Sequence, residues 1–358
     1  MNRTALSRGI LAALAVAALS IAGCANDPAS PSPSGSSGAS EYADLSGELK
    51  ASGASFPNNF YQAAIDKFAD VAPDLSVTYN SVGSGTGKKE FGAGLTDFAG
   101  SDSKVKDGDG PAPGSYYYLP TVAAPITVSY NLSGVTKLQL SPETLGKIFG
   151  RTIKNWNDPA IAADNPGVTL PNKAITVVHR SDGSGTTNNF TKYLVAAAGP
   201  AWTLGSGDTV NWAPDTQAGE KNTGVAQLVK QSDGAIGYID FADATASGLA
   251  FAAIKNKDGN YVAASLEGAT AALAGAEIAD DLTYNPLNAP GAGTYPITAP
   301  TYLLVKPSYD ATKGPLVKGF ITWLLTDGQN LANGEGYAKL PASLQQKALA
   351  KLDSVKVG

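Results

Sequence analysis

The chain is poor in cysteine, histidine and charge. A single Cys and a single His exclude an internal disulfide framework, Cys/His zinc sites and catalysis that needs more than one imidazole. Only 16% of the residues are charged, and 26 Lys and Arg are outnumbered by 31 Asp and Glu, which gives a formal net charge of −5. A broad basic face is therefore not expected, and we predict no nucleic-acid partner.

The overall composition of the chain is that of a globular protein. Hydrophobic residues make up 43% of the sequence, and the mean hydropathy of −0.07 is that of a water-soluble body rather than a polytopic membrane protein. The 40 Gly and 22 Pro residues indicate many tight turns. At about 150 residues per domain, the 358 residues predict about two domains.

The N-terminus has the features of a signal peptide followed by a lipid-attachment site. Arg3 and Arg8 precede an uncharged run over 9–22, too short for a spanning helix of about 20 residues, so residues 1–23 are predicted to be a signal peptide. The run ends at Cys24 in a sequence that resembles the bacterial lipobox, where the Cys is lipidated and cleavage occurs before it. A Cys placed by chance after an ordinary secretory signal is the alternative. Residues 24–47, rich in Ser, Pro and Gly, are predicted to be a flexible tether that leaves the body lipid-anchored on the extracytoplasmic face of the cell membrane.

Within the body, β-rich runs alternate with helical stretches, which predicts an α/β fold. The predicted strands are 75–81, 175–180, 235–239 and 302–305. The predicted helices are about 60–69, 142–149, 188–197, 223–231, 314–326 and 342–352. Ser141 is the expected N-cap of the second of these helices, because Pro142 and Glu143 suit its first turn.

One tetrapeptide occurs twice, as Gly83–Thr86 and as Gly183–Thr186. Each copy follows a predicted strand and precedes a helix expected to begin near Lys88 or near Asn188. Glycines allow close approach of the backbone to a ligand, and Ser and Thr hydroxyls and free N–H groups at a helix start donate hydrogen bonds. Such loops form anion cradles. The alternative is that both are simple turns.

Enzyme motifs fail on inspection. Gly83–Gly87 encloses three residues, one too few for a phosphate-binding Walker loop. A nucleophile elbow needs a glycine two positions before and two positions after the serine, and neither Ser84 nor Ser184 has this spacing. His179 precedes Arg180 on a predicted strand, so the two side chains point to opposite faces and His179 is expected to be structural. The acidic and glycine-rich segment 107–110 lacks the remaining ligands of a calcium loop and is predicted to be a solvated turn.

Four ordered motifs carry a family resemblance. They are Ser52–Pro57 (SGASFP), Gly83–Gly87 (GSGTG), Asp97–Asp102 (DFAGSD) and Arg180–Thr186 (RSDGSGT). Together they resemble the phosphate-binding protein of the bacterial phosphate-specific ABC transporter, over about residues 48–352. This resemblance implies a two-lobed periplasmic-binding-protein (Venus-flytrap) fold, each lobe a sheet flanked by helices, with the ligand in the cleft between them. Lobe I would comprise 48–125 and 297–358, and lobe II would comprise 126–296.

The resemblance also implies the binding site. Ser55, where the family pattern has Thr, and Phe56 would donate to phosphate from one motif, and Ser84 from the next. Asp102 would accept a proton from the ligand, and Asp182 would hold the guanidinium of Arg180 in place. The phosphate ligands carried over by motif are Ser55, Phe56, Ser84, Asp102, Arg180, Ser184, Gly185 and Thr186. No catalytic residue, metal or cofactor is expected.

The sequence therefore predicts a monomeric, non-enzymatic binding protein that captures inorganic phosphate and delivers it to the membrane permease subunits of an ABC importer. A protein for another oxyanion, such as sulfate, arsenate or molybdate, would have the same architecture. Asp102 discriminates against a fully deprotonated oxyanion, because two anionic oxygens would then face each other. A secreted phosphatase is disfavoured by the lone His and by the lack of metal motifs.

Overall fold

The computed structural model describes residues 41–358 of the chain. The predicted signal peptide, the predicted lipidation site Cys24 and most of the predicted tether lie outside the described residues. Within 41–358, no helix is both long and apolar enough to cross a membrane. The ring of Tyr42 packs edge-on against Phe68, with 5.5 Å between the ring centroids. The packed body thus already includes Tyr42, which precedes the predicted start of lobe I.

The described residues form an alternating α/β structure. The main strands are β1 (Gly47–Gly53), β2 (Leu75–Ser81), β3 (Phe98–Ser101), β4 (Tyr117–Asn131), β6 (Thr176–Arg180), β7 (Gln217–Gly219), β8 (Ala235–Asp240), β9 (Ala250–Phe251) and β12 (Thr298–Val305). Shorter strands are β5 (Gln139–Leu140), β10 (Ala253–Lys255), β11 (Tyr261–Val262), β13 (Ser308–Tyr309) and β14 (Lys356–Val357). The α-helices are α1 (Asn58–Phe68), α2 (Ser84–Gly92), α3 (Pro142–Phe149), α4 (Pro159–Asp164), α5 (Gly185–Ala197), α6 (Lys221–Gln231), α7 (Phe241–Ala246), α8 (Leu266–Ala274), α9 (Lys313–Leu325) and α10 (Ala342–Asp353).

All four predicted strands and the predicted helices are confirmed in kind, and most boundaries agree within a few residues. The Ser141 side chain accepts a hydrogen bond from the backbone N–H of Thr144, as expected of an N-cap. The expected starts of α2 and α5 were wrong. Both helices begin within the repeated tetrapeptide, at Ser84 and at Gly185, because Gly83 adopts a φ of 87° and Ser184 caps the N–H of Thr187.

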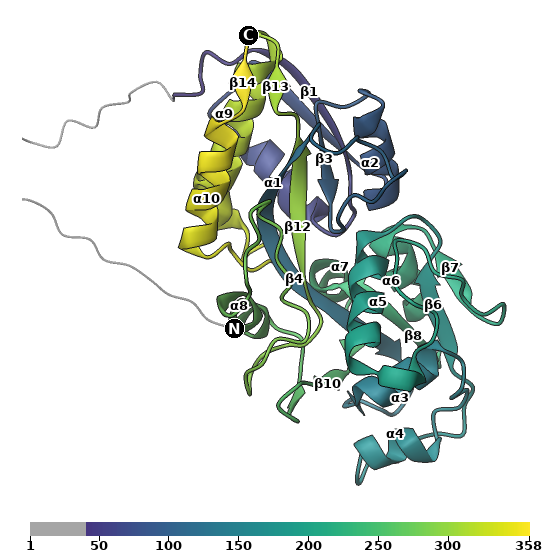
Figure 1. Ribbon diagram of the computed structural model, residues 1–358. Coiled ribbons are helices and arrows are strands. Elements are labelled where there is room, and N and C mark those ends of the chain that lie inside the picture. Colours follow the sequence, from purple (N-terminus) through teal and green to yellow (C-terminus); the bar gives the residue numbers. More distant parts are fainter. Residues whose placement is uncertain (1–40) are drawn as a thin grey trace, which may run out of the picture. The chain divides into compact units, whose positions relative to one another are not determined.

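One long strand, β4, belongs to both halves of the main sheet, whose strand order is β2-β1-β3-β12-β4-β8-β6-β7. Along Tyr117–Pro125, β4 pairs with β12, and along Ile126–Asn131 it pairs with β8. We call the part from β2 to β12 the first half and the part from β8 to β7 the second half. Figure 1 shows β4 running from one half into the other, with α2 beside the first and α5 beside the second.

Each half contributes parallel strands that end near one another. In the first half β1 is parallel to β2 and β3, and in the second half β6 is parallel to β7 and β8. In α/β sheets, ligands bind beyond the carboxyl ends of such strands. The segments after β1, β2, β3, β6 and β7 are therefore where a site is expected.

Aromatic side chains pack the helices onto both halves of the sheet. In the first half, Phe320 of α9 lies 5.3 Å from Phe68 of α1 between ring centroids. In the second half, Phe190 of α5 stacks on Tyr238 of β8 at 4.5 Å. Burial of one such side chain stabilises the fold by about 1.5–3 kcal/mol. This packing holds α9 against α1 and α5 against the sheet.

The close packing of α2 on β1 depends on Gly87. A Cβ there would lie 2.3 Å from the Cα of Gly53, which is backbone and has no room to move. In contrast, a Cβ at Gly224 in α6 would meet its nearest backbone atom at an ordinary 3.4 Å.

We therefore predict opposite outcomes for two Gly→Ala changes within helices. Gly87→Ala should lower the free energy of unfolding by about 1–3 kcal/mol through overpacking. The control Gly224→Ala should leave it unchanged or raise it by up to about 1 kcal/mol, since Ala favours the helix. Urea unfolding of both variants measures this, and equal midpoints for the two would contradict the packing described.

Candidate functional site

The two Gly-Ser-Gly-Thr segments meet in space. The N–H of Gly85 donates to the carbonyl of Gly183 over 2.9 Å. A Cβ at Gly185 would lie 2.6 Å from the Oγ of Ser84, so the first turns of α2 and α5 adjoin. The start of a helix in one half of the sheet thus faces the start of a helix in the other.

The eight predicted ligand residues all follow carboxyl ends of parallel strands or close such a strand, and all lie in this region. Ser55 and Phe56 follow β1, Ser84 follows β2, and Asp102 follows β3. Arg180 ends β6, and Ser184, Gly185 and Thr186 begin α5 just after it. All eight are buried. The structure thereby brings together residues that lie far apart in the sequence.

Five backbone amides of this set donate to no acceptor within residues 41–358. They are the N–H groups of Ser55, Phe56, Ser84, Gly185 and Thr186. Nearly all buried N–H groups in folded proteins have a hydrogen-bond acceptor, so five such donors in one place are unusual. Three of them belong to helix first turns, where the helix dipole adds positive potential. This arrangement of donors is suited to an anion.

Arg180 adds a buried positive charge. Its side chain is 1% exposed, its Nε donates to Oδ1 of Asp182 over 2.7 Å, and its Nη2 donates to Oδ2 of the same carboxylate. Burial raises the pKa of Asp182, but the hydrogen bonds and charge of Arg180 outweigh this and leave the pKa below its usual value. Nη1 of Arg180 donates to no acceptor in the described part of the chain. The guanidinium is thus oriented by Asp182 with one edge free. The resemblance implied this pairing, and the role of the pair at a phosphate site stays a prediction.

Asp102 is the one carboxyl group among these donors. Its side chain is buried, Oδ1 accepts from the hydroxyl of Thr301 over 2.7 Å, and Oδ2 lies 3.4 Å from the Oγ of Ser84. Burial raises the pKa of Asp102 to about 7, although the Thr301 hydrogen bond and the Arg180 charge act in the opposite direction. Near neutral pH this carboxyl can therefore hold or release a proton.

Two residues of the site were not predicted. Thr301, on β12, fixes the orientation of the Asp102 carboxyl. Asn222 follows β7, and its fully buried amide donates from Nδ2 to Oγ of Ser55 over 3.1 Å and to Oγ1 of Thr186 over 3.2 Å. Because both hydroxyl oxygens accept from Asn222, their own O–H protons remain available for a ligand.

The only feature of the sequence that could have pointed to Asn222 as a site residue is its position just after a strand end, and this signal was weak. The strand concerned, β7, has three residues and no recognisable pattern of apolar side chains. For Thr301 the sequence offered no signal, because its partner Asp102 is nearly 200 residues away along the chain.

Two further expectations concern neighbouring residues. The ring of His179 stacks on Trp212 at 4.8 Å and contacts the hydroxyl of Thr216 over 3.1 Å, in keeping with a structural role. Residues 107–110 form a turn as predicted, with Asp107, Gly108 and Gly110 exposed. Asp109 is only partly exposed. Its carboxylate lies 2.8 Å from Nζ of Lys88, a fully buried lysine that also pairs with Asp208 at 2.9 Å.

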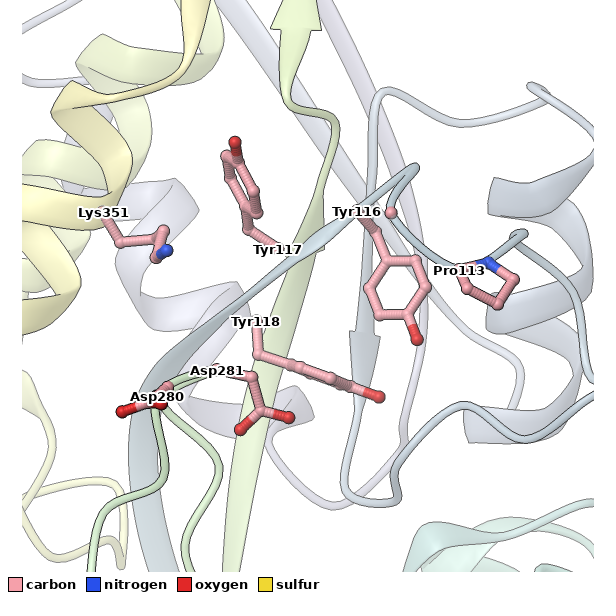
Figure 2. A pocket seen from close by; sticks show the side chains of 8 residues that line it. Pro113, Tyr116, Tyr117, Tyr118, Asp280, Asp281 and Lys351 are labelled. Atoms are coloured by element: carbon pink, nitrogen blue, oxygen red, sulfur yellow. The ribbon is translucent and has the colours of Figure 1, made fainter.

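A separate hollow of about 400 Å³ lies away from these residues. Figure 2 shows Tyr116, Tyr117 and Tyr118 on its walls, with Asp280, Asp281 and Lys351 nearby. None of the predicted site residues lines it. Among residues 41–358, no group of three His, Cys, Asp or Glu side chains is arranged to hold a metal ion.

The fold and the site define a two-lobed solute-binding protein of mixed α/β structure. A sequence profile described as a PBP superfamily domain matches residues 34–328. Phosphate-binding protein PstS 3 of Mycobacterium tuberculosis is 34% identical to this chain, and the alignment covers 99% of each protein. PstS 2 of the same species is 35% identical, with 98% of this chain and 99% of the relative covered.

Solved structures agree on the fold. A phosphate-binding protein from Stenotrophomonas maltophilia superposes with a TM-score of 0.69 at 21% identity, covering 85% of this chain and 93% of that chain. The chain belongs to the phosphate-binding protein family within the PBP superfamily. This is a family of binding proteins of transporters and not an enzyme family.

The raised pKa of Asp102 predicts a pH dependence of stability in the anion-free protein. Because the folded-state pKa of about 7 exceeds the unfolded value of about 3.9, protonated Asp102 stabilises the fold at acid pH. This contribution falls as pH rises from about 4 to about 7. Over that interval the free energy of unfolding of the wild type should fall relative to that of Asp102→Asn, and above it the difference should become constant.

Urea unfolding across this pH range measures the difference, with the exposed Asp66→Asn as the control. The control should show no such trend relative to wild type. A wild type that gains stability relative to Asp102→Asn with rising pH would contradict the burial argument.

Proposed function

We propose that this protein captures inorganic phosphate between the two halves of its sheet and passes it to an ABC-type importer. The observation that carries the proposal is the convergence of five unpartnered amides and the free edge of Arg180 on one buried carboxyl group, that of Asp102. A chain with net charge −5 can bind a dianion only through such local donors. The relatives at 34–35% identity, which are named as phosphate-binding proteins, support the same ligand.

Each residue has a role that follows from its contacts. The amides of Ser55, Phe56, Ser84, Gly185 and Thr186 donate to phosphate oxygens. The hydroxyl groups of Ser55 and Thr186 also donate to phosphate oxygens, because their own oxygens accept from Asn222 and leave the O–H protons available. The hydroxyl groups of Ser84 and Ser184 are further donors to phosphate. Arg180 binds a phosphate oxygen through the edge that Asp182 leaves free. No catalytic residue, metal or cofactor is required for this binding.

Asp102 selects for an oxyanion that carries a proton. Phosphate at neutral pH still bears hydrogen, which the carboxylate accepts, whereas sulfate bears none. Among the alternative ligands, sulfate would place two anionic oxygens together in a buried site, and molybdate would do the same. Arsenate shares the proton and should bind better than either.

The binding cleft lies between two lobes with the boundaries that the sequence predicted, 48–125 with 297–358 for lobe I and 126–296 for lobe II. In support, β4 changes its partner from β12 to β8 between Pro125 and Ile126. Contacts that join the lobes across the cleft include Gly85 with Gly183, Ser55 with Asn222, Asn189 with Asp102, and Lys88 with Asp208. This is the closed state of a hinged protein, and opening breaks these contacts.

Delivery of phosphate requires the protein to stay near its transporter. We place it on the extracytoplasmic face of the cell membrane, held by lipid on Cys24 through the Ser- and Pro-rich tether. It acts there as a monomer, and its partners are the permease subunits of the importer. A secreted phosphatase is the weaker alternative, because the site holds donors for an anion without an activated nucleophile beside them.

The first test of the proposal is the loss of one charge. Arg180→Ala removes a charge-assisted donor from a buried site, which should weaken phosphate binding by about 2–4 kcal/mol, or roughly 30- to 1,000-fold in Kd. Calorimetry on anion-stripped protein measures it. The exposed Lys154→Ala, which removes one positive charge from the same lobe, should bind as the wild type does. Phosphate affinity within twofold of wild type in Arg180→Ala would show that the site is assigned wrongly.

The second test concerns selectivity. The wild type should prefer phosphate to sulfate by at least about a thousandfold at pH 7, at about 1.4 kcal/mol per factor of ten. Asp102→Asn replaces the repelling oxygen by an amide, so sulfate binding should improve while some phosphate binding survives. Competition calorimetry with both anions gives the ratio. If the ratio is the same in Asp102→Asn as in wild type, Asp102 does not select the ligand and the other oxyanions return as candidates.

A further inference from the structure

A second cavity lies directly beside Asp102. Its volume is about 320 Å³, and its walls come from the segment after β3, from α5, from β12 and from the loop that precedes β12. Asp102 is the only one of the eight proposed phosphate ligands that lines it. The cavity therefore shares a wall with the proposed phosphate site without being part of it.

The notable side chain of this cavity is Lys192. It lies on α5, one turn after Asn189, and is only partly exposed. Within residues 41–358 it takes part in no ion pair and no hydrogen bond. Burial lowers the pKa of Lys192, and the charge of nearby Lys106 lowers it further. A cation in such a position has lost part of its hydration without gaining an anionic partner.

The other charged groups that line the cavity are Lys104, Glu277 and Asp102, and among residues 41–358 none of them forms an ion pair with Lys192. Lys104 reaches only 3.8 Å from Asp281, in a pair with both side chains about half exposed, so this cation is free to move. Against the two lysines stand Glu277, which is exposed at the rim, and Asp102, whose pKa is raised to about 7. Asp208 also acts on Lys192, but its carboxylate is already paired with Lys88.

Hydrogen bonds hold together the segments that separate the cavity from the phosphate site. The side-chain amide of Asn189 donates to the carbonyl of Asp102 over 2.6 Å and to that of Gly185 over 3.0 Å. These bonds tie α5, and with it Lys192, to the segment after β3. The space is about ten times the volume of one water molecule, about 30 Å³ in the liquid. It can hold a tetrahedral anion together with part of its hydration shell.

We propose that this cavity is a second anion site, in which Lys192 and Lys104 hold a hydrated phosphate on the outer side of Asp102. The proposal rests on the proposed function in one respect, since it takes Asp102 as the residue that separates the outer site from the main phosphate site. The outer site binds weakly, since its anion keeps water and meets only two cations. Its effect is to raise the phosphate concentration next to the cleft, so that capture is faster than it would be from bulk solution.

The test uses the whole mature protein with its main site saturated by phosphate. Further inorganic phosphate is added while the backbone amide signals of Lys104, Asn189 and Lys192 are followed by NMR. The signals should shift and saturate in the millimolar range. Lys192→Gln should weaken this second binding at least about tenfold, since a hydrogen-bonded charge contributes about 1.5–3 kcal/mol. The matched control Lys137→Gln, which removes an equal charge from an exposed position outside the cavity, should bind as wild type does.

Two further arms separate the outer site from the main one. Sulfate, which the main site should reject, should cause the same saturable shifts, because the outer site needs no proton on its ligand. Repeating the titration in Arg180→Ala tests the cavity when the main site is impaired. Saturable shifts that persist in this variant belong to the outer site and do not depend on phosphate binding at the main site. At low salt, Lys192→Gln should also slow phosphate association several-fold more than Lys137→Gln does. Shifts that do not saturate in wild type, or that persist unchanged in Lys192→Gln, would overturn the proposal.

Discussion

The starts of α2 and α5 are buried against each other, and the rest of the site depends on this. A helix start presents N–H groups that the helix itself cannot satisfy, and here those of Ser84, Gly185 and Thr186 have no acceptor within the described residues 41–358. Each buried unsatisfied donor costs about 1–3 kcal/mol. The arrangement is therefore unfavourable by several kcal/mol without an acceptor. In the proposed function an anion supplies the acceptors, and ligand binding is thereby coupled to closure.

The architecture of the sheet makes that coupling possible. The strand β4 is common to both halves and joins them, because it pairs with β12 along one part of its length and with β8 along the other. The contacts across the cleft are few and polar, among them the bond from Asn222 to Ser55 and the ion pair of Lys88 with Asp208. Such contacts can be exchanged for water when the cleft opens, whereas a large apolar interface could not be.

The sequence predicted the fold class and most of the elements, because these depend on local patterns. The eight ligand positions, which the family resemblance implied, lie together in the structure and stay a prediction as phosphate ligands. The strand over 75–81 was predicted with the boundaries that the structure has, from its β-branched and aromatic residues. The starts of α2 and α5 were placed too late, since Gly and Ser are weak helix formers and only the cap at Ser184 and the turn at Gly83 reveal the first turn. Asn222, Thr301 and Lys88 could not be predicted, because each acts through a partner that only the tertiary structure brings near.

The most direct measurement is a crystal structure of the phosphate complex at pH 7. The account predicts one phosphate between the first turns of α2 and α5, with oxygens at hydrogen-bond distance, about 2.7–3.2 Å, from the amides of Ser84 and Gly185. A further phosphate oxygen should lie at hydrogen-bond distance from the carboxyl group of Asp102. A phosphate bound elsewhere, with these amides facing water or protein, would contradict it.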